Sequence, residues 1–134
     1  MTLIVDASVA VKWGVPEAET ERAMALVGDE PILGPDLAVA EIANALWRKE
    51  TRGEIAPEQR LIALAACLSG YSELVPSRML AERALELSSA LKHPAYDCFY
   101  LALAEARDAT LITADARLLN RVRDGGWAGK CKAL

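Results

Sequence analysis

Short apolar segments alternate with longer stretches of helical periodicity along the whole chain, and this alternation narrows the possible folds more than any other feature. Strands are expected at residues 3–5, 32–33, 74–75 and 109–113. Helices are expected at residues 9–13, 17–27, 36–52, 57–68, 77–91, 94–107 and 115–123. Because strands followed by helices in repeated succession are typical of α/β proteins, the sequence predicts an α/β fold with a parallel sheet.

Length and composition predict a single domain over residues 1–134. The chain has 134 residues, of which 53% are hydrophobic and 25% charged, a composition that excludes disorder. The longest apolar run, Leu61–Leu68, is far shorter than the ~20 residues of a membrane helix. No signal peptide is expected. The three scattered cysteines suit a reducing compartment, so a cytoplasmic location is expected.

Residue counts also restrict the chemistry. Fifteen Lys and Arg against 19 Asp and Glu give a net charge of −4, which excludes a globally basic surface but allows a local basic patch. The single histidine, His93, excludes any mechanism that needs two imidazoles. The cysteines lack the paired spacing of a zinc site.

Four acidic residues break apolar segments, whereas most other acids lie among polar residues. Asp6 ends the first strand and Asp115 follows the last, while Glu41 and Asp97 interrupt apolar stretches of two helices. Taken singly, each has a structural explanation. Asp6 and Asp115 could cap helices, the negative charge of Asp97 could interact favourably with the dipole of its helix, and Glu41 could face solvent.

The expected topology brings these four acids to one edge of the sheet. Asp6 and Asp115 follow the carboxyl ends of parallel strands, and the helix carrying Glu41 begins at the same edge. The helix over residues 95–107 spans about 20 Å and leads into a strand of about 17 Å, so Asp97 should return close to Asp115. Open α/β sheets bind their ligands at this edge.

Four carboxylates in one cleft repel one another unless cations offset their charge. Oxygen donors without Cys or His select Mg²⁺ or Mn²⁺ over zinc. Mg²⁺ is commonly held by one or two carboxylates together with phosphate oxygens of the substrate. The pattern therefore predicts phosphoryl transfer or phosphodiester hydrolysis, in which the cation activates water and stabilises charge on the phosphate.

Polar and basic residues beside the four acids are candidates for supporting roles. Ser8 and Thr113 lie two residues from Asp6 and Asp115, and Asn44 lies one helical turn beyond Glu41. Capping explains Ser8 and Thr113 equally well. The basic residues expected near the same edge, and hence the candidates for substrate contacts, are Lys12, Arg48 and Arg117.

Four motifs in order resemble the PIN domain, and more narrowly the toxin of the VapBC toxin–antitoxin type. They are LIVDAS (residues 3–8), PDLAVAEIANAL (35–46), YDCFYLALA (96–104) and LITAD (111–115). The resemblance extends over essentially the whole chain. One local difference is the segment Ala116–Leu119, where many family members carry an Asp-Phe-like pair.

The resemblance implies a three-layer α/β/α fold around a central, mostly parallel sheet. It also implies an Mg²⁺- or Mn²⁺-dependent endoribonuclease with Asp6, Glu41, Asp97 and Asp115 as its catalytic, metal-binding acids, of which Asp6 and Asp97 are the direct ligands. The implied partners are an RNA substrate, a second copy of the chain in a homodimer, and a cognate VapB-like antitoxin that blocks the cleft.

Two other interpretations remain open from the residues alone. One is another Mg²⁺-dependent α/β phosphotransfer enzyme, although Ser8 stands where a haloacid-dehalogenase-type enzyme would carry a second aspartate. The other is a catalytically weak PIN-like binding module, which would have no need of four clustered acids. An EDTA-reversible nuclease assay on unstructured RNA separates the three.

Overall fold

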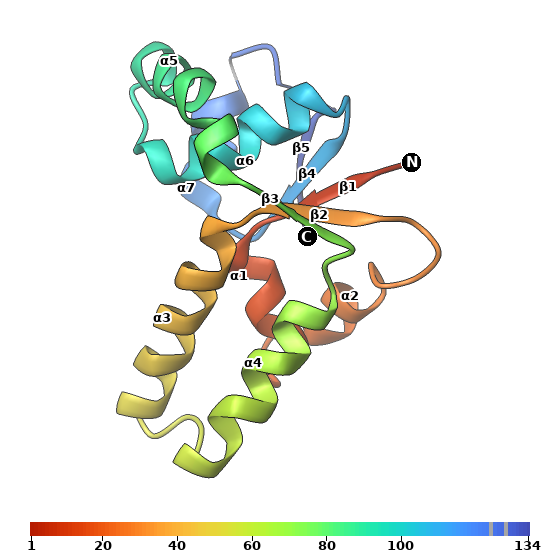
Figure 1. Ribbon diagram of the computed structural model, residues 1–134, viewed down its shortest axis with the longest axis vertical. Coiled ribbons are helices and arrows are strands. Elements are labelled where there is room, and N and C mark those ends of the chain that lie inside the picture. Colours follow the sequence, from red (N-terminus) through yellow and green to blue (C-terminus); the bar gives the residue numbers. More distant parts are fainter. Residues whose placement is uncertain (124, 128) are drawn as a thin grey trace.

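Five parallel strands form the centre of the fold, in the order β3-β2-β1-β4-β5 (Figure 1). The computed structural model describes residues 1–123, 125–127 and 129–134. All the neighbouring strand pairs are parallel, which confirms the predicted sheet. The strands are β1 (Leu3–Val5), β2 (Ile32–Pro35), β3 (Glu73–Val75), β4 (Thr110–Thr113) and β5 (Cys131–Ala133).

Helices cover both faces of this sheet, so the expected three-layer α/β/α architecture is confirmed. In Figure 1, α1 to α4 lie on one side of the strands and α5 and α6 on the other, while α7 packs against β5. The α-helices are α1 (Ala7–Ala10), α2 (Thr20–Met24), α3 (Leu37–Thr51), α4 (Arg60–Ser69), α5 (Ala81–Leu91), α6 (Ala95–Ala106) and α7 (Ala116–Arg123). Short 3₁₀-helical turns lie at Val11–Trp13, Pro57–Gln59 and Ser77–Met79.

The strand order reverses at β1, and this reversal positions the site. From β1 the chain leads outward to β2 and β3, and it then crosses to β4 and β5 on the opposite side of β1. Helices leave the sheet in different directions at such a point, so a crevice remains at the carboxyl ends of the strands. Asp6 follows β1 directly, and Asp115 lies two residues after β4.

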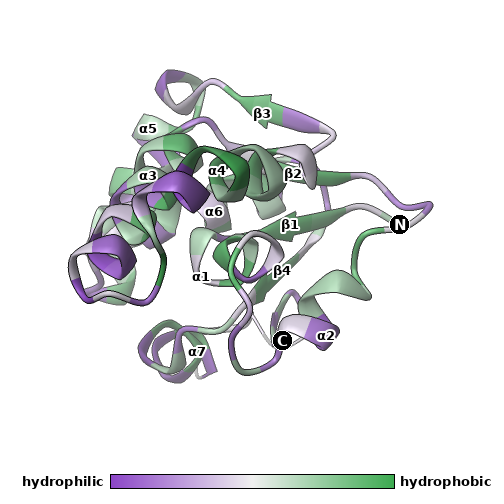
Figure 2. Cartoon of the chain, turned by 90° about the horizontal axis from the view of Figure 1, so that it is seen from below, coloured by the Kyte–Doolittle hydropathy of each residue, from purple (hydrophilic) through white to green (hydrophobic). Residues whose placement is uncertain are grey.

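The core lies where β1, β4 and α6 meet. Ile4, Leu101 and Leu111 are fully buried there, as expected for a strand pair covered by an apolar helix. Figure 2 shows hydrophobic residues along β1 and β2 and hydrophilic residues on outer segments. None of the helices in the described residues is long and apolar enough to cross a membrane.

Two elements differ from the sequence prediction. The expected helix over residues 17–27 is reduced to α2, and at its N-terminal end the left-handed conformation of Glu19 (φ 70°) prevents a start at residue 17. Strand β5 was not predicted, since a lysine at its centre leaves no apolar run. Backbone hydrogen bonds set this edge strand in place, including one of 3.0 Å from the Leu134 N–H to the Thr113 carbonyl.

Candidate active site

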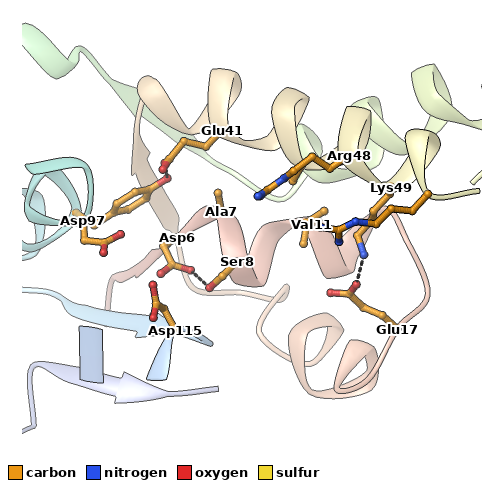
Figure 3. Close-up of a pocket in the computed structure, with 13 residues that line it drawn as sticks. Asp6, Ala7, Ser8, Val11, Glu17, Glu41, Arg48, Lys49, Asp97 and Asp115 are labelled. Atoms are coloured by element: carbon orange, nitrogen blue, oxygen red, sulfur yellow. Dashed lines mark hydrogen bonds and ion pairs between the residues drawn. The ribbon is translucent and has the colours of Figure 1, made fainter. Parts of the chain in front are cut away.

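The four acids that break apolar segments line one cavity of about 390 Å³ at the carboxyl edge of the sheet. Asp6 follows β1, Glu41 lies on α3, Asp97 lies on the first turn of α6, and Asp115 follows β4. In Figure 3 their side chains approach a common space from four different elements. The structure thus brings together residues that lie up to 109 positions apart in the sequence.

The Asp6 carboxylate is buried and surrounded by hydrogen-bond donors. Its Oδ1 accepts a hydrogen bond of 2.5 Å from the Ser8 hydroxyl and one of 3.3 Å from the Val9 N–H, which caps α1. Its Oδ2 accepts a hydrogen bond from the Thr113 hydroxyl. Burial raises the pKa of Asp6 from 3.8 to about 6, although these hydrogen bonds lower it. The structure therefore places Ser8 and Thr113 in contact with Asp6.

Glu41 is held at the cavity by a residue that the sequence pattern did not identify. The Tyr100 hydroxyl on α6 donates a 2.6 Å hydrogen bond to Glu41 Oε1. Burial, together with the negative charges of Asp6 and Asp97, raises the pKa of Glu41 from 4.5 to about 7, although the Tyr100 hydrogen bond lowers it. Tyr100 was missed because an aromatic residue on an apolar helix face resembles ordinary core.

Asp97 and Asp115 also have partners of their own. His93 Nε2 and Asp97 Oδ2 lie 2.5 Å apart, four residues from one another at the start of α6. Asp115 Oδ1 accepts hydrogen bonds from the N–H groups of Arg117 (2.8 Å) and Leu118 (3.3 Å) in the first turn of α7. The four-residue spacing of His93 and Asp97 was the available signal for this contact, although His93 lies just before α6.

Asn44 differs from its prediction, since it is exposed and does not line the cavity. At 3.6 residues per turn, a residue three positions beyond Glu41 is rotated about 60° to one side of it. Ala45 and Arg48 lie closer to the Glu41 direction, and these two residues line the cavity instead. Beside Glu41, the face of α3 that lines the cavity therefore carries Ala45 and Arg48 and does not include Asn44.

The three basic candidates occupy different surroundings. Lys12 is buried, and its ammonium group donates to Glu17 Oε1 (3.0 Å) and to the Ala18 carbonyl (3.1 Å). Arg48 lines the cavity that contains the four acids. Arg117 lines a second cavity of about 460 Å³, which shares Asp97 and Asp115 with the first.

The chemistry of these donors fits a hard divalent cation. Within residues 1–123, 125–127 and 129–134, no three acidic, His or Cys side chains already surround one point as a complete ligand set. Mg²⁺ does not require such a set, because it keeps several waters and commonly takes only one or two carboxylates. The raised pKa values of Asp6 and Glu41 reflect buried, mutually repelling carboxylates, whose charge a cation would offset.

The whole architecture has close counterparts among known proteins. The family model described as PIN domain matches residues 3–125. Ribonuclease VapC3 of Pyrobaculum aerophilum is 32% identical over 124 residues, with 90% of this chain and 95% of that protein covered. Ribonuclease VapC9 of Mycobacterium tuberculosis is 34% identical over 116 residues, with 87% of each chain covered.

A solved toxin–antitoxin complex from Klebsiella pneumoniae has the same fold, with a TM-score of 0.68 at 17% identity over 97% of this chain and 95% of that one. The chain belongs to the PIN-domain family. Membership in this family of ribonucleases implies the use of a divalent metal ion.

The raised pKa values predict how the stability of the metal-free protein changes with pH. The folded state binds protons on Asp6 and Glu41 more tightly than the unfolded state, so the free energy of unfolding falls as pH rises from about 4 to 7. Glu41→Gln removes one of these charges and keeps an acceptor for Tyr100. At pH 8 in EDTA we expect this variant to be more stable by about 1 kcal/mol, allowing for solvent screening.

Thermal melting in EDTA between pH 4 and pH 8 measures this effect, and the difference should shrink as the pH falls and vanish below about 4.5, the ordinary pKa of a glutamate. Glu82→Gln, which neutralises an exposed glutamate on α5, is the matched control and should melt like the wild type at every pH. A Glu41→Gln protein that melts below the wild type at pH 8 would contradict charge crowding.

Proposed function

We propose that this protein is a metal-dependent endoribonuclease that hydrolyses RNA phosphodiester bonds. The observation that carries the proposal is the convergence of Asp6, Glu41, Asp97 and Asp115 on one cavity at the carboxyl edge of the sheet. The names of the VapC relatives, which are ribonucleases, support the same activity.

In this proposal the four acids hold the cation, and Asp6 and Asp97 are its direct ligands. Mg²⁺ suits these oxygen donors, and Mn²⁺ can replace it. When bound, the ion lowers the pKa of water and stabilises charge on the phosphate. The protein's own contribution is orientation: Ser8 and Thr113 fix Asp6, Tyr100 contacts Glu41, and His93 contacts Asp97.

Basic side chains on both sides of the acids support an RNA substrate. Arg48 and Arg52 line the first cavity on the α3 side. Arg117 and Arg121 line the second cavity on the α7 side. Because the two cavities share Asp97 and Asp115, an extended strand laid across them would place its backbone over the acids and its neighbouring phosphates near arginines. Internal cleavage of a single strand agrees with this arrangement.

Asp97→Asn tests the metal site directly, because it removes the charge and keeps the shape. We expect Mg²⁺-dependent cleavage of unstructured RNA to fall at least about 100-fold, the scale for losing one key electrostatic contributor. Asp108→Asn is the matched control, since its carboxylate is 95% exposed and its backbone φ of 47° suits asparagine. Cleavage should require divalent ions and stop reversibly in EDTA; near-wild-type activity in Asp97→Asn would refute the site.

Arg48→Gln and Arg117→Gln test the substrate path. Each substitution removes one positive charge that faces the RNA backbone, so the KM for RNA should rise several-fold with little change in kcat. The slope of log affinity against log salt should become shallower by about 0.7 for each single-strand phosphate that the variant no longer neutralises. Arg22→Gln serves as the control because this exposed arginine on α2 lines neither cavity. Equal KM values and slopes in all four proteins would exclude these arginines as RNA-binding residues.

We also propose that the protein is the toxin of a type II toxin–antitoxin pair, acting in the cytoplasm as a single-domain chain that forms a homodimer. Its proposed partner is a VapB-like antitoxin. Exposed apolar side chains on α3 and α4, including Trp47 (60% exposed) and Leu61 (72%), support coverage by a partner.

The acidic cavity suggests how such an antitoxin would inhibit. A guanidinium or ammonium group supplies positive charge and matched donors, so we expect an antitoxin segment to insert Arg or Lys among the four carboxylates. Replacing every cleft-reaching basic residue of the antitoxin by Gln should abolish inhibition of RNA cleavage while the complex still forms on a sizing column. Full inhibition by the substituted antitoxin would show that it blocks the site in another way.

A further inference from the structure

The buried hydroxyl of Tyr100 is a polar group whose only described acceptor is one of the four acids. Tyr100 is 1% exposed and lies on α6, three residues after Asp97. Its hydroxyl donates to Glu41 Oε1 at 2.6 Å, which joins α6 to α3 across the cavity. A buried hydroxyl is stable only with a partner, so Tyr100 and the cavity-facing position of Glu41 depend on each other.

Glu41 needs such a partner more than the other acids do. Asp6 and Asp115 are short side chains held by backbone N–H groups, whereas Glu41, in the second turn of α3, has a longer side chain with one more rotatable bond. The negative charges of Asp6 and Asp97 repel its carboxylate towards solvent. Among the described residues, no basic side chain forms an ion pair with Glu41, and Tyr100 is its hydrogen-bond donor.

We propose that Tyr100 is a positioning residue that holds the Glu41 carboxylate over the cavity, so that its second oxygen, Oε2, is available to a divalent cation. The inference rests on the proposed function, since it assigns Glu41 to the cation. It adds that the affinity of the site for the cation depends on the hydrogen bond from the Tyr100 hydroxyl on α6 to Glu41 on α3. Such supporting hydrogen bonds orient ligands before the ion arrives, and their loss weakens metal binding.

Tyr100→Phe removes the hydroxyl and keeps the ring. We expect the Mn²⁺ dissociation constant, measured by calorimetry or by electron paramagnetic resonance of free Mn²⁺ without RNA, to rise about 10-fold or more. Tyr71→Phe is the matched control. Its hydroxyl donates 2.7 Å to the Val5 carbonyl, so this variant also removes a tyrosine hydrogen bond near the site, but one that ends on backbone. The control should bind Mn²⁺ like the wild type even if it melts lower.

A double-mutant cycle separates positioning from a general structural effect. In a Glu41→Ala background, adding Tyr100→Phe should leave the remaining Mn²⁺ affinity unchanged, because the tyrosine acts through Glu41. A further decrease of similar size in that background would overturn the proposal, as would equal affinity of wild type and Tyr100→Phe. If Tyr100→Phe does not fold, a variant with p-aminophenylalanine at position 100 keeps a hydrogen-bond donor on the ring. This variant should bind Mn²⁺ with an affinity close to that of the wild type. A folded variant of this kind with weakened Mn²⁺ binding would also overturn the proposal.

The wild-type protein distinguishes the role of Tyr100 from the proposed function as a whole. Wild type that binds Mn²⁺ and cleaves RNA, with Tyr100→Phe unaffected, rejects the role of Tyr100 alone. Wild type that neither binds Mn²⁺ nor cleaves RNA rejects the proposed function, and the positioning role with it.

Discussion

The Asp6 carboxylate is only 4% exposed at the end of the central strand, so fixed protein donors stabilise most of its charge. Ser8 and Val9 provide donors from α1, and Thr113 provides one from the end of β4. The hydrogen bonds that stabilise this acid therefore also hold the first helix and two neighbouring strand ends together. The same hydrogen bonds therefore stabilise this edge of the sheet and position Asp6 in the candidate site.

Each remaining acid has a separate partner, which explains how four carboxylates stay close to one another in the folded chain. Tyr100 contacts Glu41, His93 contacts Asp97, and N–H groups at the start of α7 contact Asp115. These partners come from different elements, so packing of the whole domain determines the geometry of the site. The raised pKa values of Asp6 and Glu41 show that the donors offset only part of the burial and repulsion. A bound cation would offset the rest.

The basic residues near the site divide into two groups, which explains how a chain of net charge −4 can present positive charge locally. Lys12 and Lys49 both bind Glu17, at 3.0 and 2.5 Å, and so join the turn after α1 to α3. Arg48 and Arg117 instead line the cavities on either side of the acids. The paired lysines stabilise the wall of the first cavity, and the arginines remain open to a polyanion.

Much of this arrangement follows from the sequence alone. Apolar periodicity is local, so it predicted β1 to β4 and most of the helices, and the rule that parallel strands end at one edge predicted the convergence of the four acids. The edge strand β5 was not predicted because backbone hydrogen bonds, rather than an apolar run, define it. Asn44 turned out to lie outside the cavity, and Tyr100 to contact an acid 59 positions away. Only the tertiary structure decides such contacts, because they depend on how each helix is rotated about its axis and on how closely it packs. A local sequence pattern does not fix side-chain positions with the precision that a hydrogen bond requires.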